Sequence, residues 1–285
     1  MNPERFALLG HPLGHSLSPF LHTRLFALSG RKAVYTLEDI PPEQLAGSFP
    51  ALLGRLRGCN VTIPYKQAVI PFLSALRGRA ELYRSVNTVS VTETGAVGYN
   101  TDAEGFLASL RDADVPLGGR VVLLGAGGVG RTFACEAALA GARIVNAVRE
   151  SGIASADSLR TYVRELVPDV SYDVVPLSRL AELEGDIDLL INATPVGMHP
   201  HPDASPVGEA VLRHTAAVFD AVYNPGETRL LRMAKACGAK TVGGMPMLVW
   251  QAAAAHACWY GGSFDPEDIR QLIADAYSEL ARSFG

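Results

Sequence analysis

The segment Val121-Val-Leu-Leu-Gly-Ala-Gly-Gly-Val-Gly-Arg-Thr-Phe-Ala134 predicts the fold of the middle of the chain. Four apolar residues come first, then a glycine-rich turn, then a run with the composition of a helix. In a dinucleotide-binding fold the first glycine allows a tight turn, the second admits a pyrophosphate, and the third lets helix and strand pack closely. The helix N-terminus offers N–H groups to an anion. The alternative is an ordinary glycine-rich turn, but the strand before it and the helix after it favour a dinucleotide.

Short apolar runs alternate with helix-like stretches after this segment, as in a parallel sheet covered by helices. The expected strands are Ile144-Val145, Asp188–Ile191, Val218-Phe219 and Thr241-Val242, and the expected helices lie near 129–140, 155–166 and 227–236. We therefore predict a doubly wound domain. The first hundred residues also alternate and form a second α/β unit, with strands expected at Phe6–Leu9, Val34–Leu37, Cys59–Thr62 and Val86–Val89.

Composition and charge exclude several classes of protein. The chain has 285 residues, of which 48% are hydrophobic and 19% charged, with a formal net charge of -4. These values are typical of a folded protein with room for two domains, and no run of Lys or Arg suggests nucleic acid as a partner. The four cysteines are far apart and form no CxxC pair, and the histidines at 11, 15, 199 and 201 do not form a metal-binding pattern with cysteines or carboxylates. We expect neither disulfides nor a metal site.

Two stretches bear on localisation and membranes. The start, Met1-Asn-Pro-Glu-Arg-Phe6, lacks the pattern of a signal peptide, so we expect no export and a cytoplasmic protein. Residues 241–264 contain no Asp, Glu, Lys or Arg, but glycines and a proline leave only Met247–Tyr260 uninterrupted. That run is too short to span a bilayer and predicts a buried helix. A last helix is expected after Asp265, which can cap it, with Pro266 in its first turn.

Polar side chains gather in loops marked by glycine and proline. In the first part of the chain these are Ser16-Leu-Ser18-Pro19, Asn60-Val-Thr62-Ile-Pro64-Tyr-Lys66, Ser85-Val-Asn87-Thr88 and Gly98-Tyr-Asn100-Thr101-Asp102-Ala-Glu-Gly105. Later ones are Asn192-Ala-Thr-Pro195-Val-Gly-Met198, Asp220-Ala-Val-Tyr223-Asn-Pro225 and Gly244-Met-Pro-Met247-Leu-Val-Trp-Gln251. In this order, and over nearly the whole chain, the sequence resembles the shikimate dehydrogenase family.

The resemblance implies an α/β enzyme of two domains with a cleft between them. Residues 1–103, completed by C-terminal helices at 245–285, would form a substrate-binding domain, and residues 104–244 a Rossmann-type NAD(P)-binding domain. The implied activity is an NAD(P)-dependent oxidoreductase that acts on a CH–OH group. It reduces 3-dehydroshikimate to shikimate reversibly with NADPH, on the route to chorismate and the aromatic amino acids. The implied partner is this small-molecule substrate, and family members are monomers or homodimers.

The resemblance also implies a set of site residues. The catalytic pair is Lys66 and Asp102, and the substrate-binding residues are Ser16, Ser18, Thr62, Asn87, Tyr223 and Gln251. The cofactor-binding residues are Gly125, Ala126, Gly127, Gly128, Val129, Gly130, Arg149, Thr194, Met198 and Gly244. The pair suits the chemistry, because hydride delivery to a ketone leaves a developing alkoxide that needs a proton donor. A lysine is protonated at neutral pH, and a neighbouring carboxylate would hold and direct it.

Simpler roles remain open for several of these residues. Ser16 and Ser18 could be turn and cap residues before Pro19, Gln251 a lone polar group in a core helix, and Tyr223 a tyrosine at the edge of the core. The choice of cofactor also stays open, because Arg149 could pair with the 2′-phosphate of NADP whereas Glu150 would repel it and suit the free ribose hydroxyl of NAD. Members of the family that use NADP commonly carry a second basic residue here, which this chain lacks.

Two rival functions follow from the same residues. The first is a quinate or quinate/shikimate dehydrogenase that uses NAD. Members of the family that accept quinate often have a threonine or another change at these positions, so serines at both 16 and 18 favour shikimate. Serine and threonine differ by only one methyl group, which discriminates weakly between substrates. The second is a non-catalytic dinucleotide or shikimate sensor, which would be expected to have lost Lys66 or Asp102. Both are present, so the sequence favours the enzyme.

Overall fold

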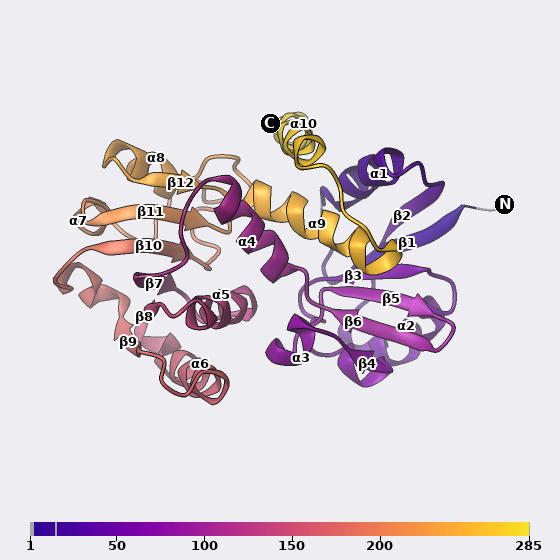
Figure 1. Ribbon diagram of the computed structural model, residues 1–285, viewed down its shortest axis with the longest axis horizontal. Helices are drawn as coiled ribbons and strands as arrows, with labels where there is room; N and C mark the ends of the chain where they lie inside the picture. Colours follow the sequence, from indigo (N-terminus) through magenta and orange to yellow (C-terminus); the bar gives the residue numbers. More distant parts are fainter. Residues whose placement is uncertain (1–2, 15, 285) are drawn as a thin grey trace. The chain divides into compact units, whose positions relative to one another are not determined.

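The computed structural model describes residues 3–14 and 16–284. The chain divides into two compact units, Met1–Gly105 with Val249–Gly285 as unit 1, and Phe106–Leu248 as unit 2. It passes from unit 1 to unit 2 within helix α4 (Asp102–Asp112) and returns within helix α9 (Gly244–Tyr260), as the colours in Figure 1 show. Unit 2 is thus inserted into the sequence of unit 1.

Unit 1 contains a mixed six-stranded sheet with the order β2-β1-β3-β5-β6-β4. Its strands are β1 (Glu4–Gly10), β2 (Ala33–Asp39), β3 (Gly58–Val61), β4 (Ala75–Leu76), β5 (Thr88–Thr92) and β6 (Gly95–Tyr99). Its helices are α1 (Ser18–Leu28), α2 (Leu45–Leu53), α3 (Arg79–Tyr83) and α10 (Pro266–Phe284), with 3-10 turns η1 (Pro42–Gln44) and η2 (Ile70–Phe72). Strands β1, β2 and β3 are parallel, and β5 runs antiparallel to both β3 and β6.

The hairpin of β5 and β6 was not predicted from the sequence. The run Gly95-Ala-Val-Gly98 reads as a loop because it is rich in glycine, yet it pairs along its whole length with β5. The strand expected at Val86–Val89 begins at Thr88, because the Val86 N–H bonds to the Lys66 carbonyl and leaves the ladder. Both differences concern residues next to the polar motifs.

Each face of the sheet of unit 1 packs against its own hydrophobic cluster. On one side, Phe6, Phe26, Tyr35 and Trp259 bring β1, α1, β2 and the C-terminal half of α9 together. On the other side, a larger cluster that includes Phe49 and Tyr65 packs under α2. Helix α10 lies against α1, and the Glu267 N–H donates to the Asp265 carboxylate at 2.8 Å, which is the predicted cap.

Unit 2 is the predicted doubly wound domain, with six parallel strands in the order β12-β11-β10-β7-β8-β9. The strands are β7 (Arg120–Leu124), β8 (Arg143–Val148), β9 (Tyr172–Pro176), β10 (Ile187–Asn192), β11 (Thr215–Asp220) and β12 (Lys240–Val242). The helices are α5 (Gly128–Leu139), α6 (Ile153–Leu166), α7 (Glu209–Leu212) and α8 (Arg229–Ala236), with 3-10 turns η3 (Glu150–Gly152) and η4 (Leu177–Glu182). Read from the β9 end, this is the strand order of dinucleotide-binding domains.

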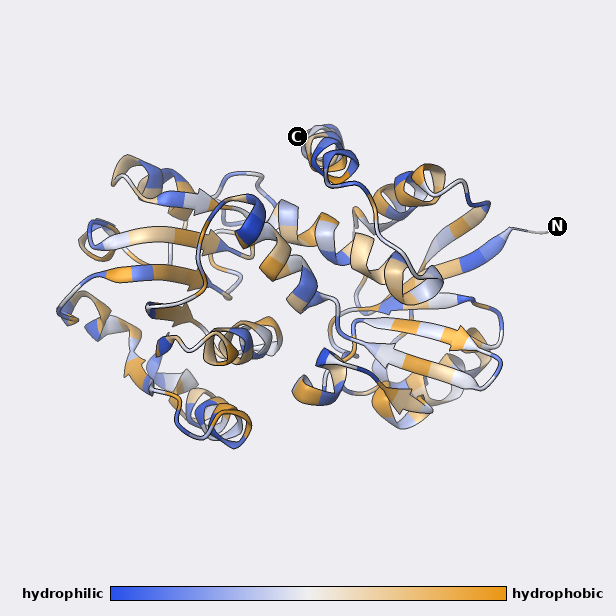
Figure 2. Ribbon diagram, viewed as in Figure 1, coloured by the Kyte–Doolittle hydropathy of each residue, from blue (hydrophilic) through white to orange (hydrophobic). Residues whose placement is uncertain are grey.

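The core of unit 2 lies between the sheet and its helices. The rings of Phe106, Phe133 and Phe219 meet at 4.5 to 5.4 Å, so the C-terminal part of α4 is anchored there. Figure 2 shows helices such as α6 and α10 with mixed hydrophobic and hydrophilic faces, and the inner face of α6 carries Leu159 and Val163. Strand β9 was missed because Tyr172-Asp-Val-Val-Pro176 combines an acidic residue with a proline in a short run.

Helix α9 starts earlier than predicted. It begins at Gly244 instead of Met247, because Pro246 falls in the first turn, where its missing N–H costs no hydrogen bond. Within the described part of the chain, no helix combines the length and the apolar composition needed to cross a membrane.

Candidate functional site

The polar motifs of unit 1 meet at one edge of its sheet because of the strand directions. Strands β1, β3 and β6 all end at this edge, and β5, which runs the other way, begins there. Thr62 therefore follows β3, Asn87 precedes β5, and Asp102 follows β6 at the start of α4. The Thr62 N–H donates to the Leu9 carbonyl at 2.8 Å, which holds the ends of β1 and β3 side by side.

Lys66 and Asp102 form an ion pair at this edge. The Lys66 Nζ lies 2.6 Å from Asp102 Oδ2, and the exposed fractions of the two side chains are 24% and 12%. The Asn100 side chain accepts the Asp102 N–H at 3.1 Å and so caps α4, and the positive helix end favours the carboxylate. The backbone of Lys66 is held by the Val86 N–H at 2.7 Å. The Lys66 amine is thus held by a carboxylate and remains partly exposed.

Asn87 links this pair to α9. Its Oδ1 accepts the backbone N–H of Thr101 at 2.7 Å, and because a backbone N–H can only donate, this bond sets the orientation of the amide. The Nδ2 group then faces Asp102 Oδ1 at 2.9 Å and Gln251 Oε1 at 3.4 Å. Four of the predicted residues, Lys66, Asn87, Asp102 and Gln251, are therefore brought together by the fold.

A buried network behind Asn87 was not predicted. Thr88 Oγ1 donates to Asn87 Oδ1 at 3.1 Å, and the Asn60 side chain donates to Thr88 Oγ1 at 3.0 Å. Tyr35 on β2 donates to Asn60 Oδ1 at 2.8 Å. Thr88 and Asn60 stood in the motifs of the sequence, but only their contacts show that they position Asn87.

The serine loop and Thr62 lie at the same edge through their strands. The loop follows β1, and Ser16 Oγ accepts the Ser18 N–H at 3.2 Å where α1 begins. The side chain of Ser18 is buried, whereas Ser16 and Thr62 are half-buried. The turn role that the sequence left open for Ser16 is therefore present, and it leaves the hydroxyl proton of Ser16 available to another acceptor.

The glycine-rich turn of unit 2 has the geometry that a dinucleotide requires. Gly125 has a φ of +97°, which residues with a side chain rarely adopt. A Cβ there would also lie only 2.9 Å from Thr194 Cγ2, so both the backbone conformation and the lack of space require glycine. A Cβ at Gly130 would lie 3.3 Å from the Gly125 carbonyl oxygen, which explains the close contact of helix and strand. At Gly127 and Gly128, however, a Cβ would meet nothing within 4 Å.

The open space at Gly127 and Gly128 lies at the start of α5, where the first backbone N–H groups have no side-chain cap. Gly127 is the N-cap of α5 and provides no side chain to bond its first N–H groups. Glycine at these two positions therefore leaves room for a ligand to approach the backbone. The free N–H groups and the positive end of the helix dipole suit a phosphate. The residues present fit a dinucleotide. Asn146 stabilises the turn, since its Nδ2 donates to the Gly125 carbonyl at 2.9 Å.

Polar residues at the ends of β10 and β11 form a second buried network. Asp220 is fully buried, and its carboxylate accepts from Thr228 Oγ1 at 2.6 Å and from Asn192 Nδ2 at 2.9 Å. Burial raises the pKa of Asp220, while these hydrogen bonds lower it. Asn192 Oδ1 in turn accepts both the N–H and the hydroxyl of Thr194. The network fixes the loop next to Gly125, and of its members the sequence assigned a role only to Thr194.

The remaining predicted residues of unit 2 lie at the same carboxyl edge. Arg149 is exposed and directly follows β8, and Met198 is 44% exposed in the loop after β10. Tyr223 is half-buried after β11, and burial raises the pKa of its hydroxyl. A Cβ at Gly244 would lie 2.4 Å from the Ala221 carbonyl oxygen, so glycine is required there by packing alone.

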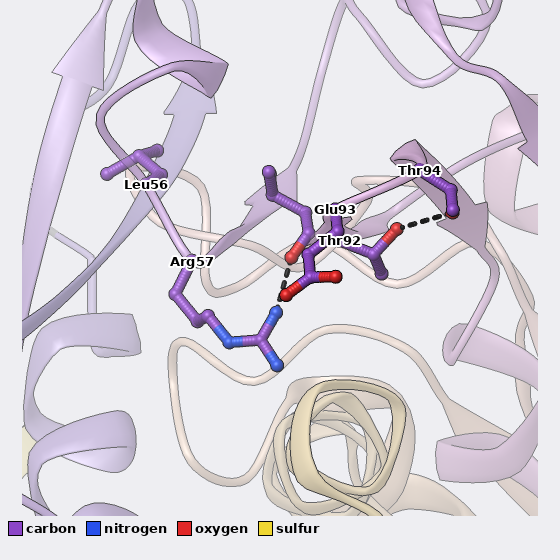
Figure 3. Close-up of a pocket in the computed structure, with 6 residues that line it drawn as sticks. Leu56, Arg57, Thr92, Glu93 and Thr94 are labelled. Atoms are coloured by element: carbon purple, nitrogen blue, oxygen red, sulfur yellow. Dashed lines mark hydrogen bonds between the residues drawn. The ribbon is translucent and has the colours of Figure 1, made fainter.

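A depression elsewhere on unit 1 does not share these features. It lies at the turn between β5 and β6, the opposite end of the hairpin from Asn87, and Figure 3 shows Arg57 and Glu93 beside it. The Arg57 guanidinium donates to the Val91 carbonyl and lies 3.8 Å from Glu4. Its charge is already used within the chain, so this depression does not compete with the residues gathered at the sheet edge of unit 1 or with those at the carboxyl edge of unit 2.

The doubly wound sheet with its glycine turn, joined to a second α/β unit, defines the class of dinucleotide-dependent oxidoreductases. Residues 8–89 match the family model described as the shikimate dehydrogenase substrate binding domain. The chain is 40% identical over 276 residues to a shikimate dehydrogenase (NADP(+)) of Methanopyrus kandleri, and the match covers 94% of each chain. The chain belongs to the shikimate dehydrogenase family.

Solved structures agree with this assignment. The shikimate 5-dehydrogenase of Thermus thermophilus, in complex with NADP(H) and shikimate, has a TM-score of 0.84 at 37% identity and covers 96% of this chain and 99% of its own. The quinate dehydrogenase of Corynebacterium glutamicum, in complex with NAD, has the same TM-score of 0.84 at 29% identity, and covers 96% and 99%. The expected α/β fold with a Rossmann-type domain is confirmed.

Proposed function

We propose that this chain is a shikimate dehydrogenase that reduces 3-dehydroshikimate to shikimate with NADPH, reversibly, in the formation of chorismate and aromatic amino acids. The observation that carries the proposal is the Lys66–Asp102 pair at 2.6 Å, held at one sheet edge with Asn87 and Gln251. This arrangement provides an accessible proton donor that is held by the Asp102 carboxylate, and Asn87 in turn holds Asp102. A non-catalytic sensor would have no use for it.

The chemistry assigned to the chain's own residues is proton transfer and orientation. NADPH, when bound, supplies the hydride. Lys66 Nζ donates a proton to the oxygen that was the ketone, and its positive charge stabilises that oxygen as negative charge develops. Asp102 holds the Lys66 ammonium by the ion pair, and Asn87 holds Asp102 by its amide. In the oxidation of shikimate the same amine accepts the proton, so the neutral form of Lys66 is the active one in that direction.

The substrate's carboxylate and hydroxyl groups need donors and acceptors around this pair. We assign Ser16, Ser18 and Thr62 to them because the loop after β1 and the end of β3 share the edge that carries Lys66. Gln251, whose Oε1 faces Asn87 Nδ2, and Tyr223 complete the proposed set. Unit 1, with the proposed borders 1–103 and 245–285, carries all of these substrate-binding residues except Tyr223, which belongs to unit 2.

The cofactor is assigned to the carboxyl edge of unit 2, within the proposed borders 104–244. The N–H groups at Gly127 to Val129 hold the pyrophosphate, and Ala126 and Gly130 shape the turn. Arg149 takes the 2′-phosphate of NADP, because it follows β8, where the ribose of a dinucleotide lies in this fold. Thr194, Met198 and Gly244 belong to loops at the same edge. The protein is proposed to act in the cytoplasm.

The proposed function is tested by following reduced cofactor by absorbance, with shikimate or quinate and with NADP or NAD. We expect turnover with shikimate and NADP, and a rate of oxidation that rises toward alkaline pH. Lys66→Ala is expected to lower kcat by about 10²–10⁴-fold while the melting temperature stays close to that of the wild type. Lys235→Ala, an exposed lysine on α8, is the matched control and should leave kcat unchanged.

Two results would contradict the proposal. Turnover with quinate and NAD alone would make the chain a quinate dehydrogenase. Cofactor binding without turnover of either substrate would support the sensor. A flat pH profile of a rate-limiting chemical step would remove Lys66 as the acid and base while leaving the substrate assignment intact.

A further inference from the structure

The end of strand β2 lies beside the loop that carries the serines. Strands β1 and β2 are parallel and stay in register up to Gly10 and Asp39, so both end at the sheet edge that also carries Lys66. The loop with Ser16 follows β1, and where it begins the Ile40 N–H donates to the Gly10 carbonyl at 3.3 Å. The sequence assigned no role to Asp39 or Ile40.

Asp39 bonds to two positions of this loop, one with each carboxylate oxygen. Its Oδ2 accepts the Leu13 N–H at 2.9 Å, and its Oδ1 lies 2.7 Å from His11 Nδ1. Because an ionised carboxylate can only accept, His11 Nδ1 carries the proton of that bond. The Leu13 N–H, and after it the His11 ring, hold the pKa of Asp39 below its ordinary value. The carboxylate is therefore charged in neutral and alkaline solution, and both bonds persist there.

The same part of the loop packs against Thr62. A Cβ at Gly10 would lie 2.6 Å from Leu13 Cδ2 and 2.6 Å from Thr62 Cγ2, so these two side chains close over the glycine. Leu13 also packs against the aromatic cluster of β1, α1 and β2. Ser16 follows three residues later in the chain. The place of Leu13, which Asp39 holds by its backbone, therefore bears on two of the proposed substrate-binding residues.

The exposure of these bonds shows where their effect lies. The side chains of His11 and Asp39 are 36% and 42% exposed. Charged contacts at this exposure add little to the stability of a fold, because water competes for both partners. They can still fix a short loop, because one carboxylate binds two of its positions. Removal of the Asp39 carboxylate should therefore leave unit 1 folded and release the loop.

Ile40, the next residue, holds the turn that carries Lys66. The Tyr65 hydroxyl donates to the Ile40 carbonyl, and Tyr65 is 2% exposed in the cluster under α2. The Tyr65 N–H donates to the Thr62 carbonyl at 2.9 Å, and the Lys66 carbonyl accepts the Val86 N–H. The backbone that presents the Lys66 amine is thus fixed both at Lys66 and at the residue before it.

We propose that Asp39 and Tyr65 are positioning residues for the dehydrogenase reaction, and that the end of β2 thereby aligns the two parts of the substrate site. Asp39 places the serine loop for the carboxylate and hydroxyl groups of the substrate, and Tyr65 places Lys66 for proton transfer. The inference rests on the proposed function. The two effects separate in kinetics, because a loop that only binds the substrate acts on KM and the proton donor acts on kcat.

The first test measures initial rates of shikimate oxidation with NADP. Asp39→Ala should raise the KM for shikimate by about ten-fold or more and leave kcat and the KM for NADP within about two-fold of the wild type. Asp39→Asn keeps an oxygen that can accept the Leu13 N–H, so it should restore most of the affinity. Loss of a negative charge near an anionic substrate would by itself lower KM, so a rise in KM identifies lost positioning.

Glu38→Ala is the matched control for Asp39. It removes the same charge from the neighbouring residue, whose carboxylate accepts from Thr36 Oγ1 at 3.2 Å within β2. Its KM for shikimate should stay close to that of the wild type. If the wild type turned over quinate in place of shikimate, the same comparison would be made with the KM for quinate.

Tyr65→Phe tests the second half of the proposal. It keeps the buried ring and removes one hydrogen bond, and should lower kcat by about three-fold or more with little change in the KM for shikimate. Tyr260→Phe is its control, because the Tyr260 hydroxyl donates to Glu4 Oε2 at 2.7 Å at the other end of β1. It should leave kcat unchanged. Melting temperatures check that each variant is folded.

A further measurement does not depend on turnover. In the protein without ligands, backbone hydrogen exchange over residues 11–18 should be faster in Asp39→Ala than in the wild type or in Glu38→Ala. A wild type that turned over neither substrate would overturn the proposed function, and exchange would still show whether Asp39 holds the loop. Unchanged exchange or an unchanged KM in Asp39→Ala, an equal rise of KM in Glu38→Ala, or an unchanged kcat in Tyr65→Phe would each overturn the inference.

Discussion

Asn87 illustrates how single side chains prepare this site. It touches Asp102, Thr101, Thr88 and Gln251, and one backbone N–H decides which way its amide points. The ion pair of Lys66 and Asp102 would otherwise be free to rotate, since a lysine has several rotamers of similar energy. Residues without an acid–base role, such as Asn87, therefore also help to orient the Lys66–Asp102 pair.

Arg149 and Glu150 carry the prediction on cofactor choice. Both are exposed and directly follow β8. Arg149→Ala should raise the KM for NADP by about ten-fold and hardly change that for NAD, because one charged hydrogen bond to a phosphate is lost. Glu150→Gln should lower the KM for NADP by removing a repulsive charge. Initial rates with shikimate measure both.

The control for this prediction is Arg143→Ala, an exposed arginine at the other end of β8. It should leave both KM values unchanged. If Arg149→Ala raised the KM for NADP and the KM for NAD equally, Arg149 would support the fold of the loop and would not bind the 2′-phosphate.

Loops at the ends of strands depend on buried polar contacts for their shape. The loop after β10 and the turn after β11 share Asp220, which is fully buried and accepts from Thr228, Asn192 and the Val222 N–H. Thr228 also caps α8, since its Oγ1 accepts the Leu231 N–H at 3.3 Å. One hydroxyl thus joins a helix to two loops of the proposed cofactor site.

Thr228→Val is expected to lower the free energy of unfolding by about 1–3 kcal/mol, because a helix cap is lost and a buried carboxylate loses a donor. Thr228→Ser keeps the hydroxyl and should cost less. Chemical denaturation measures both variants. A Thr228→Val variant as stable as the wild type, with Thr228→Ser the less stable of the two, would show that Thr228 contributes its methyl group and not its hydrogen bonds.

The response of the whole molecule to acid depends on a pair of buried histidines. His22 on α1 and His256 on α9 lie 3.1 Å apart, from Nδ1 to Nε2, in the aromatic cluster of unit 1, and His22 stacks on Tyr35 at 4.2 Å. Burial, followed by the charge of His256, holds the pKa of His22 well below 6.5. Burial, followed by the charge of Arg31, lowers the pKa of His256 to about 3.

Stability should therefore fall as the pH drops below about 6.5. The unfolded chain binds protons at both histidines there and the folded chain does not, so unfolding becomes easier by about 1.4 kcal/mol per pH unit for each histidine. The effect of His256 continues down to its folded pKa of about 3. Unfolding by urea at pH 7 and at lower pH measures the slope.

His256→Gln should reduce this slope by about 1.4 kcal/mol per pH unit, which is the contribution of one proton. His201→Gln, at an exposed histidine, is the matched control and should leave the slope as it is. A slope that His256→Gln does not change would mean that carboxylates, and not this pair, account for the acid sensitivity.

The sequence predicted much of this molecule from local signals. The glycine turn after Val121–Leu124, the parallel sheet of unit 2 and the last helix after Asp265 are all present. Such features follow from residues close together in the chain, because turn geometry, helix caps and hydrophobic period act over a few positions. The motifs around Lys66 and Asp102 could also be recognised from neighbouring residues in the sequence. The sequence did not show that the two side chains are in contact.

The tertiary structure supplied what depends on residues far apart. Strand β6 forms in spite of its glycines because β5 pairs with it, and Asp220 becomes the centre of a network because β10 and β11 are neighbours. The contact of Lys66 with Asp102 arises from the directions of β3, β5 and β6, and that of Asp39 with Leu13 from the pairing of β1 with β2. Hydrogen bonds between distant segments have no local signature, so only folding brings these groups together.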